Sequence, residues 1–177
     1  KALISVFPGS RKSEVEVLTP ILLEFIKLMN LKYNDFKYVF HSTKTLNNLI
    51  HSYIRSNDLH NCEVICDDKI KSHILKKSIF AISKSGTVSL EICNEKIPSI
   101  IFYKMGIINF LIIKMLVNTK FANIINIAAK EEIIPELLQS NCNANNIYKK
   151  VSYFLENPDK IKDQVSRTQI IIKKLKT

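Results

Sequence analysis

The chain has 177 residues, 46% of them hydrophobic, and a formal net charge of +10. This composition supplies the core of one domain and excludes a disordered chain, and no apolar run reaches the ~20 residues that cross a bilayer. The charge favours an anionic partner: nucleic acid, an acidic membrane surface or a phosphorylated small molecule. It does not choose among the three, because a sequence so rich in Lys, Asn and Ile is basic through composition alone.

Short apolar runs alternate with segments of helical spacing along the chain. We predict strands at residues 2–7, 38–40, 62–66, 79–83 and 98–102. We predict helices from Ser10, as the cap, to Leu28, and then at 45–54, 70–75 and 86–93. The last third is predicted to be helical, in runs at 135–139, at 145–155 and from Pro158 onward. The alternation predicts an α/β fold, a Rossmann-like doubly wound parallel sheet with a helical carboxy-terminal extension.

Two of the three glycines lie where a predicted strand meets a predicted helix. Gly9 follows the first strand and is followed by Ser10 and Arg11, and the segment Ser85-Gly86-Thr87 follows the fourth strand. Glycine lets backbone N–H groups approach a ligand closely, and the amino terminus of a helix favours an anion. One such loop alone could be a tight turn without a ligand. Two polar glycine loops at the same edge of one sheet favour a shared site for the phosphates of a nucleotide-type ligand.

Glu91 lies four residues after Thr87, about one helical turn further along the same face. A carboxylate at this place could accept hydrogen bonds from ribose hydroxyls while the loop holds phosphate; the alternative is a solvated surface acid. Neither glycine loop has the spacing of the dinucleotide-binding or P-loop motifs. We also expect no metal site, since the four cysteines and four histidines show no metal-ligand spacing.

The motifs, taken in order, resemble those of one family. Phe7-Pro8-Gly9-Ser10-Arg11 is similar to the signature that opens the donor-binding half of the lipid-A-disaccharide synthase family. Ser85-Gly86-Thr87-Val88-Ser89-Leu90-Glu91 is similar to that family's Ser-Gly-Thr-x-x-Leu-Glu motif. Residues 98–105, 117–126 and 136–139 resemble its later blocks in order and spacing. The resemblance therefore runs through nearly the whole chain.

This resemblance implies one half of a GT-B glycosyltransferase, a hexosyltransferase that needs no cofactor. It would transfer diacylglucosamine from UDP-2,3-diacylglucosamine to 2,3-diacylglucosamine 1-phosphate (lipid X), giving lipid A disaccharide and UDP. Residues 1–156 would form the UDP-sugar-binding domain, and residues 157–177 a helix that packs back toward the amino-terminal half. The general base would belong to that other half, so we expect this chain to be the later part of a longer protein and inactive alone.

The resemblance also implies roles for individual residues and partners. Arg11 would be catalytic, by stabilising the leaving diphosphate, and Glu91 would bind the ribose. The remaining substrate-binding residues would be Gly9, Ser10, Ser85, Gly86, Thr87 and Asn126. The expected location is cytoplasmic, peripheral on the anionic inner-membrane surface, with no nucleic acid as partner and with a homodimer as an open possibility.

The sequence departs from the family pattern at three places. Ile125 stands where proline is usual before Asn126, and Lys84 replaces a small residue before the second glycine loop. Lys130 and Glu131 occupy a place where glycine is common.

Two other functions remain as alternatives. Another UDP-sugar enzyme of GT-B fold, such as a UDP-N-acetylglucosamine 2-epimerase, would share these loops, and a basic nucleic-acid-binding module would use the charge. Aromatic residues make up only 8% of the chain, and no recognition-helix pattern is visible, which disfavours the second alternative. Among other features, His41 ends the second predicted strand, where it could reach the cleft, although a surface role is the favoured interpretation. The apolar stretch 106–117 is interpreted as a core or dimer helix, or as part of an interface or acyl pocket.

Overall fold

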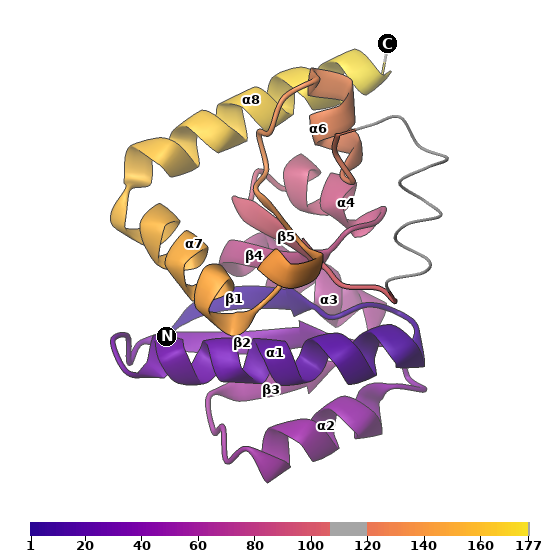
Figure 1. Ribbon diagram of the computed structural model, residues 1–177, viewed down its shortest axis with the longest axis vertical. Coiled ribbons are helices and arrows are strands. Elements are labelled where there is room, and N and C mark those ends of the chain that lie inside the picture. Colours follow the sequence, from indigo (N-terminus) through magenta and orange to yellow (C-terminus); the bar gives the residue numbers. More distant parts are fainter. Residues whose placement is uncertain (107–119, 177) are drawn as a thin grey trace.

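The computed structural model describes residues 1–106 and 120–176, which form a six-stranded sheet covered by helices on both faces (Figure 1). The strand order is β3-β2-β1-β4-β5-β6, and within the described residues neighbouring strands pair in parallel. The strands are β1 (Ala2–Phe7), β2 (Phe36–His41), β3 (Cys62–Ile65), β4 (Ser78–Lys84), β5 (Ser99–Tyr103) and β6 (Glu136–Leu138). This is the order of the doubly wound dinucleotide-binding folds.

Helices connect the strands and cover the two faces of the sheet. They are α1 (Lys12–Asn30), α2 (Asn47–Ser56), α3 (Asp68–Lys77), α4 (Val88–Asn94), α6 (Ile124–Ala129), α7 (Ala144–Glu156) and α8 (Pro158–Lys176). Helices α1, α2 and α7 share one core cluster, and α3, α4, α6 and α8 contribute to the clusters on the other face. In the described part of the chain, no helix is long and apolar enough to span a membrane.

Side-chain alternation along each strand divides the core between these two faces. In β1, Ile4 and Val6 point into the cluster under α1 and α7, whereas Phe7 packs with the cluster under α3 and α4. β4 does the same, with Phe80 and Ile82 on the first face and Ala81 on the second. Strands buried on both faces are typical of parallel sheets. The predicted fold class is therefore confirmed, including the continuous apolar runs on which it rested.

One predicted element was wrong. Residues 135–139 were expected to be helical, but Glu136–Leu138 form the edge strand β6, whose Leu137 pairs with Phe102 of β5. Gln139 then turns the chain with a positive φ of 53° and opens a short 3-10 helix, Gln139–Asn141. A strand of three residues is too short to show the period of two that distinguishes it from a helix.

The start of α1 also differs from the prediction. The helix begins at Lys12, with Arg11 rather than Ser10 at the N-cap position. The cap is formed by Glu14, whose carboxylate accepts hydrogen bonds from the N–H groups of Ser10 and Arg11. Glu14, the third residue of the helix, therefore reaches back and satisfies N–H groups that no helical carbonyl can accept from.

Helix α8 lies across α4 and α6 and also contacts α7 (Figure 1). Its Gln164 is buried and bonds to the backbone of Ser99 in both directions: Ser99 N donates to Oε1 at 2.7 Å, and Nε2 donates to Ser99 O at 2.9 Å. The helix is thus joined to the start of β5. Its predicted contact with an amino-terminal half stays a prediction. The apolar stretch 106–117 lies, apart from Gly106, outside the described residues.

Candidate functional site

The two glycine loops leave neighbouring strands at the same edge of the sheet. β1 pairs with β4 up to Phe7 and Ser83, so the segments that follow both strands begin side by side. The chain passes from β1 through α1 to β2 on one side, and from β4 through α4 to β5 on the other. Ligands of open α/β sheets bind in the crevice that such a reversal of direction creates. The sheet topology therefore supports a site between the predicted loops.

The first loop has an unusual backbone at Gly9 and an exposed cation next to it. Gly9 has φ +113°, a conformation that residues with a side chain rarely adopt. Ser10 and Arg11 are both exposed. No ion pair or hydrogen bond engages the Arg11 guanidinium among the residues that the structure describes. This planar group is well suited to bind a phosphate in a bidentate manner.

Glu14 occupies the inner side of this loop. A Cβ at Gly9 would lie 2.5 Å from Glu14 Oε2 and 2.9 Å from Glu14 Cβ, so the loop follows this side chain closely. Ser10 N and Arg11 N donate to Oε2 at 3.2 and 3.3 Å. The sequence predicts that backbone N–H groups of this loop approach a ligand, but the N–H groups of Ser10 and Arg11 are satisfied inside the protein in this conformation.

Lys84 joins the first loop to the second. Its Nζ lies 2.9 Å from Glu14 Oε1 and 5.1 Å from the ring centroid of Tyr103. Burial alone would raise the pKa of Glu14, but the hydrogen bond and charge of Lys84, with the N–H groups of Arg11 and Ser10, lower that pKa below its ordinary value. The carboxylate is therefore ionised at neutral pH and neutralises Lys84, which leaves Arg11 as the exposed cation of the two loops.

The second loop presents Gly86 and Thr87 to solvent. Among the described residues other than Gly86 and its two chain neighbours, no heavy atom lies within 4 Å of the position that a Cβ at Gly86 would take. The hydroxyl of Ser85 donates to the carbonyl of Ala122 at 3.1 Å, and the hydroxyl of Ser89 donates to the carbonyl of Gly86 at 2.7 Å. These two bonds fix the backbone of the loop, while Gly86 and Thr87 remain exposed to solvent.

A cleft of about 440 Å³ lies at the carboxyl ends of β1 and β2, between α3 and α4. It is lined by Phe7, His41, Asp68, Lys71, Ser72, Leu75, Glu91, Asn94 and Glu95. Its charged residues are mostly acidic, and Lys71 is paired with Asp68 at 3.2 Å. An acidic wall repels phosphate but can accept hydrogen bonds from hydroxyl groups. The cleft therefore places Glu91 where its predicted role at a ribose is possible.

His41 is buried at the base of this cleft, so the favoured interpretation, a surface role, was wrong, and the alternative, that His41 reaches the cleft, agrees with the structure. Its ring stacks on Phe7 with centroids 4.1 Å apart, and its Nε2 lies 2.8 Å from the hydroxyl of Ser5. Its Nδ1 is buried without a hydrogen-bond partner among the described residues. Burial, and to a smaller extent the charge of Lys71, lowers the pKa of His41 to about 3. The imidazole is therefore neutral at physiological pH.

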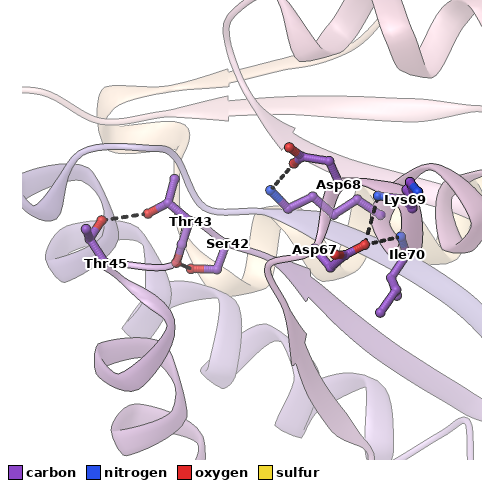
Figure 2. A network of polar contacts seen from close by, with 8 residues as sticks. Ser42, Thr43, Thr45, Asp67, Asp68, Lys69 and Ile70 are labelled. Atoms are coloured by element: carbon purple, nitrogen blue, oxygen red, sulfur yellow. Dashed lines mark hydrogen bonds and ion pairs between the residues drawn. The ribbon is translucent and has the colours of Figure 1, made fainter.

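Local capping shapes the wall of the cleft that α3 provides (Figure 2). Asp67 accepts hydrogen bonds from Lys69 N and Ile70 N, both at 3.0 Å, and thereby starts the helix directly after β3. On the neighbouring strand end, Thr43 and Thr45 join their hydroxyls at 3.0 Å. The carboxylate of Asp67 thus fixes the start of α3 at the edge of the sheet where the candidate site lies, whereas α2, with Leu46 at its N-cap position, begins without a side-chain cap.

Comparison with known proteins identifies the family. The model of the lipid-A-disaccharide synthetase family matches residues 1–177, which is the whole chain. The chain belongs to this family. A curated relative, the lipid-A-disaccharide synthase of Rickettsia prowazekii, is 33% identical over 173 residues, which cover 98% of the chain and 45% of the relative. The chain thus spans about half the length of such relatives and corresponds to their carboxy-terminal half.

Solved structures confirm the GT-B type of fold for this member of the family. The carboxy-terminal domain of a group 1 glycosyl transferase (LpcC) from Francisella tularensis has a TM-score of 0.65 at 13% identity, with 98% of this chain and 85% of that chain covered. The UDP-GlcNAc 2-epimerase from Neisseria meningitidis, solved with UDP-GlcNAc bound, has a TM-score of 0.64 at 16% identity. The match covers 99% of this chain and 44% of the epimerase. At such identities the likeness concerns the fold alone.

Asn126, the last predicted site residue of this synthetase-family chain, lies apart from the cleft residues. It is fully buried, and its side chain bonds to the segment before β6. Its Nδ2 donates to Ile134 O at 2.7 Å and to Glu136 Oε1 at 2.9 Å. Its Oδ1 accepts from Ile133 N and Ile134 N, both at 2.9 Å. Its amide thus holds the turn between α6 and β6, and its predicted contact with the sugar donor stays a prediction.

The structure therefore brings the two glycine loops to one edge of the sheet and puts Glu91 on the neighbouring cleft. Sequence reasoning missed Glu14, although the spacing Arg11-x-x-Glu14 is that of a helix-capping acid. It also missed the pairing of Glu14 with Lys84, because no local pattern links residues so far apart. In the described part of the chain, no cluster of three or more His, Cys, Asp or Glu side chains is placed to hold a metal ion.

Proposed function

We propose that this chain is the part of a lipid-A-disaccharide synthase that binds the UDP-sugar donor. The observation that carries the proposal is the placement of two glycine loops at the reversal point between β1 and β4, in a chain of this family. The exposed Arg11 lies on one loop, and the other leads into α4 and Glu91. In this arrangement the diphosphate of UDP would lie next to the Arg11 guanidinium, and the ribose would lie in the acidic cleft. The guanidinium complements the negative charge of the diphosphate, and the carboxylates can accept hydrogen bonds from the ribose hydroxyls.

The reaction we propose is a displacement at the anomeric carbon of UDP-2,3-diacylglucosamine. The attacking oxygen is a hydroxyl of 2,3-diacylglucosamine 1-phosphate; it forms the new C–O bond while the bond from the anomeric carbon to the diphosphate breaks. The hydroxyl proton passes to a base that this chain does not supply, and UDP leaves with the bonding electrons. Arg11 would stabilise the negative charge that grows on the diphosphate, most strongly in the transition state.

Ligand-dependent thermal unfolding tests the binding step. The melting temperature of the chain should rise with UDP and rise less with UMP, because only UDP of the two brings two phosphates to Arg11. A ligand present at 100 times its dissociation constant stabilises a protein by ~2.7 kcal/mol, which such a scan detects. A wild-type chain that melts at the same temperature with and without saturating UDP would contradict the proposal.

Turnover tests the transfer step. We expect the chain alone to be inactive, and the chain joined to the amino-terminal half of the Rickettsia prowazekii synthase to release UDP only when the lipid acceptor is present. Release of UDP with the sugar donor alone would favour the epimerase alternative. A homodimer, which the resemblance leaves open, would appear as a doubled molar mass of the chain in solution.

The membrane surface is the remaining proposed partner. The net charge of +10 favours attraction to anionic lipid, and α8 carries basic residues near its carboxyl end. Such attraction would place the protein on the cytoplasmic face of the inner membrane, where its lipid substrates are reached. Co-sedimentation with vesicles containing 30% anionic lipid, lost at high salt and absent with neutral vesicles, is the expected result.

A further inference from the structure

The carboxylate of Glu14 connects the two loops of the candidate site. One oxygen, Oε2, accepts from the N–H groups of Ser10 and Arg11 in the first loop. The other, Oε1, is paired at 2.9 Å with Lys84, the last residue of β4 and the neighbour of the second loop. The Glu14 side chain is only 8% exposed and that of Lys84 25%, so solvent screens this pair weakly. Both oxygens of one buried side chain are therefore used to join segments that are distant in sequence.

The backbone of the first loop is shaped around the same side chain. Gly9 has φ +113°, and a Cβ there would clash with Glu14 Oε2 at 2.5 Å. The loop can take this path only because residue 9 has no side chain. The conformation of Gly9 and the ion pair with Lys84 are independent observations, and both place the carboxylate at the centre of the two loops.

The contacts of Glu14 also determine which groups remain for an anionic ligand. The N–H groups of Ser10 and Arg11 are occupied, and the charge of Lys84 is neutralised. The Arg11 guanidinium, which starts from the same short loop, is exposed. The ion pair of Glu14 and Lys84 is therefore largely buried and neutral overall. Among the described residues of the two loops, Arg11 is the cation that faces solvent.

We propose that Glu14 is a positioning residue, which holds the first loop against Lys84 so that Arg11 and the Ser85-Gly86-Thr87 loop together receive the diphosphate. This inference rests on the proposed function, because it assumes that UDP binds at these loops. Glu14 acts through Arg11 and Lys84 and does not touch the ligand itself. Loss of Glu14 should therefore weaken UDP binding only as long as Arg11 is present to be positioned.

A double-mutant cycle on the chain tests this dependence. We expect Glu14→Ala to weaken the affinity for UDP about tenfold in calorimetry, and to weaken it less than twofold when Arg11 has already been replaced by alanine, because groups that act as a unit are not additive. Glu16→Gln is the matched control on the same helix, since Glu16 is exposed and pairs with Lys12, also exposed, at 3.7 Å. Its affinity for UDP should equal that of the wild type.

The outcomes separate positioning from support of the fold. A Glu14→Ala chain that melts at a lower temperature but, when folded, binds UDP as tightly as the wild type overturns the inference and leaves the proposed function intact. The inference is also overturned if Glu14→Ala weakens the affinity for UDP by the same factor in the wild-type chain and in the Arg11→Ala chain. A wild-type chain that binds no UDP overturns the proposed function and the inference together.

Lys84→Met provides a second test that does not require Glu14 to be truncated. The groups that face the carboxylate are Lys84 from β4 and the N–H groups of Ser10 and Arg11. Without Lys84, a buried negative charge remains next to the diphosphate, and we expect UDP to bind about tenfold more weakly at pH 7.5. Glu14→Gln combined with Lys84→Met removes that charge, and the amide oxygen of the glutamine can still accept from the N–H groups of Ser10 and Arg11 and hold the first loop. Affinity should therefore return to within about threefold of the wild type.

The pH dependence distinguishes charge from packing in this second test. In Lys84→Met the carboxyl should take up a proton as the pH falls, because its burial is no longer compensated. At each pH, the affinity of Lys84→Met for UDP is compared with that of the double variant, so that protonation of UDP itself cancels. The ratio of the two affinities should approach one as the pH falls from 7.5 to 5. A ratio that is constant with pH, or a double variant as weak as Lys84→Met, would overturn the role assigned to Glu14.

Discussion

The imidazole of His41 lies flat on the ring of Phe7, 4.1 Å away between centroids and nearly parallel at 23°. Phe7 is the last residue of β1 and His41 the last residue of β2, so this stack closes the base of the cleft at the point where both strands end. Ser5 bonds to the same imidazole and to the hydroxyl of Ser78, both at 2.8 Å. A neutral, hydrogen-bonded histidine is thus part of the floor on which the candidate site is built.

This burial predicts acid sensitivity. The pKa of His41 is about 3 in the folded chain and about 6.5 in the unfolded chain, so between these values the unfolded state binds one proton more. The free energy of unfolding should therefore fall as the pH drops from 6.5 toward 3, by ~1.4 kcal/mol per pH unit from this group. Urea denaturation of the chain at a series of pH values measures this slope.

The variant His41→Gln should flatten that slope, because glutamine can bond to Ser5 and does not titrate. His73→Gln is the control: His73 lies on α3 but is exposed, so its replacement should leave the slope as in the wild type. An unchanged slope in His41→Gln would show that His41 is not the group that links folding to pH in this range.

Arg11 should contribute more to turnover than to ground-state binding. If charge grows on the leaving diphosphate, Arg11→Ala should lower kcat roughly 100- to 1,000-fold while KM for the sugar donor rises much less. The measurement is UDP release by the chain joined to an amino-terminal half of the family. Arg11→Lys should recover only part of the rate, because an ammonium cannot bind in a bidentate manner.

Arg55→Ala is the matched control for this experiment, since Arg55 is exposed on α2, on the opposite side of β2 from the two loops. We expect it to leave both constants unchanged. Full kcat in Arg11→Ala would remove Arg11 from the catalytic step, whatever its effect on KM.

The sheet could be predicted from sequence because its main strands are continuous apolar runs. Ile4, Val6, Phe80 and Ile82 are fully buried, as strands covered on both faces require. β6 could not be predicted in this way, since only one of the three residues Glu136–Leu138, the central Leu137, is buried. Its pairing with β5 is a tertiary contact, and the local spacing of residues 135–139 suits a helix equally well.

The candidate site was predictable only in outline. Both loops could be located from their glycines, because a glycine between a strand and a helix indicates a turn with a backbone conformation that other residues rarely adopt. The direction of the Glu14 side chain depends on the φ of Gly9 and on Lys84, which lies seventy residues away, so no local pattern contains it. The burial of His41 likewise depends on Ser5 and Phe7 from another strand.

Asn126 should be essential for stability. Removal of its amide in Asn126→Ala leaves the N–H groups of Ile133 and Ile134 and the carbonyl of Ile134 buried without these partners. We expect a loss of ~3 kcal/mol in the free energy of unfolding, measured by urea denaturation. Asn145→Ala, at an exposed position of α7, should change that free energy by less than ~0.5 kcal/mol. A fully stable Asn126→Ala chain would show that this turn does not depend on the amide.

Lys130 ends α6 in the left-handed region, with φ 58° and ψ 23°, at a place where the resemblance noted in the sequence leads us to expect glycine. A residue with a Cβ is strained in this conformation by about 1 kcal/mol, and glycine is not. Lys130→Gly should therefore raise the free energy of unfolding by ~1 kcal/mol, seen as a higher melting temperature. The control is Lys149→Gly, at an exposed position inside α7, where glycine should cost ~1 kcal/mol instead. If both substitutions destabilise the chain, the left-handed backbone at Lys130 is not the source of strain, and the departure from the family pattern at this position is without energetic cost.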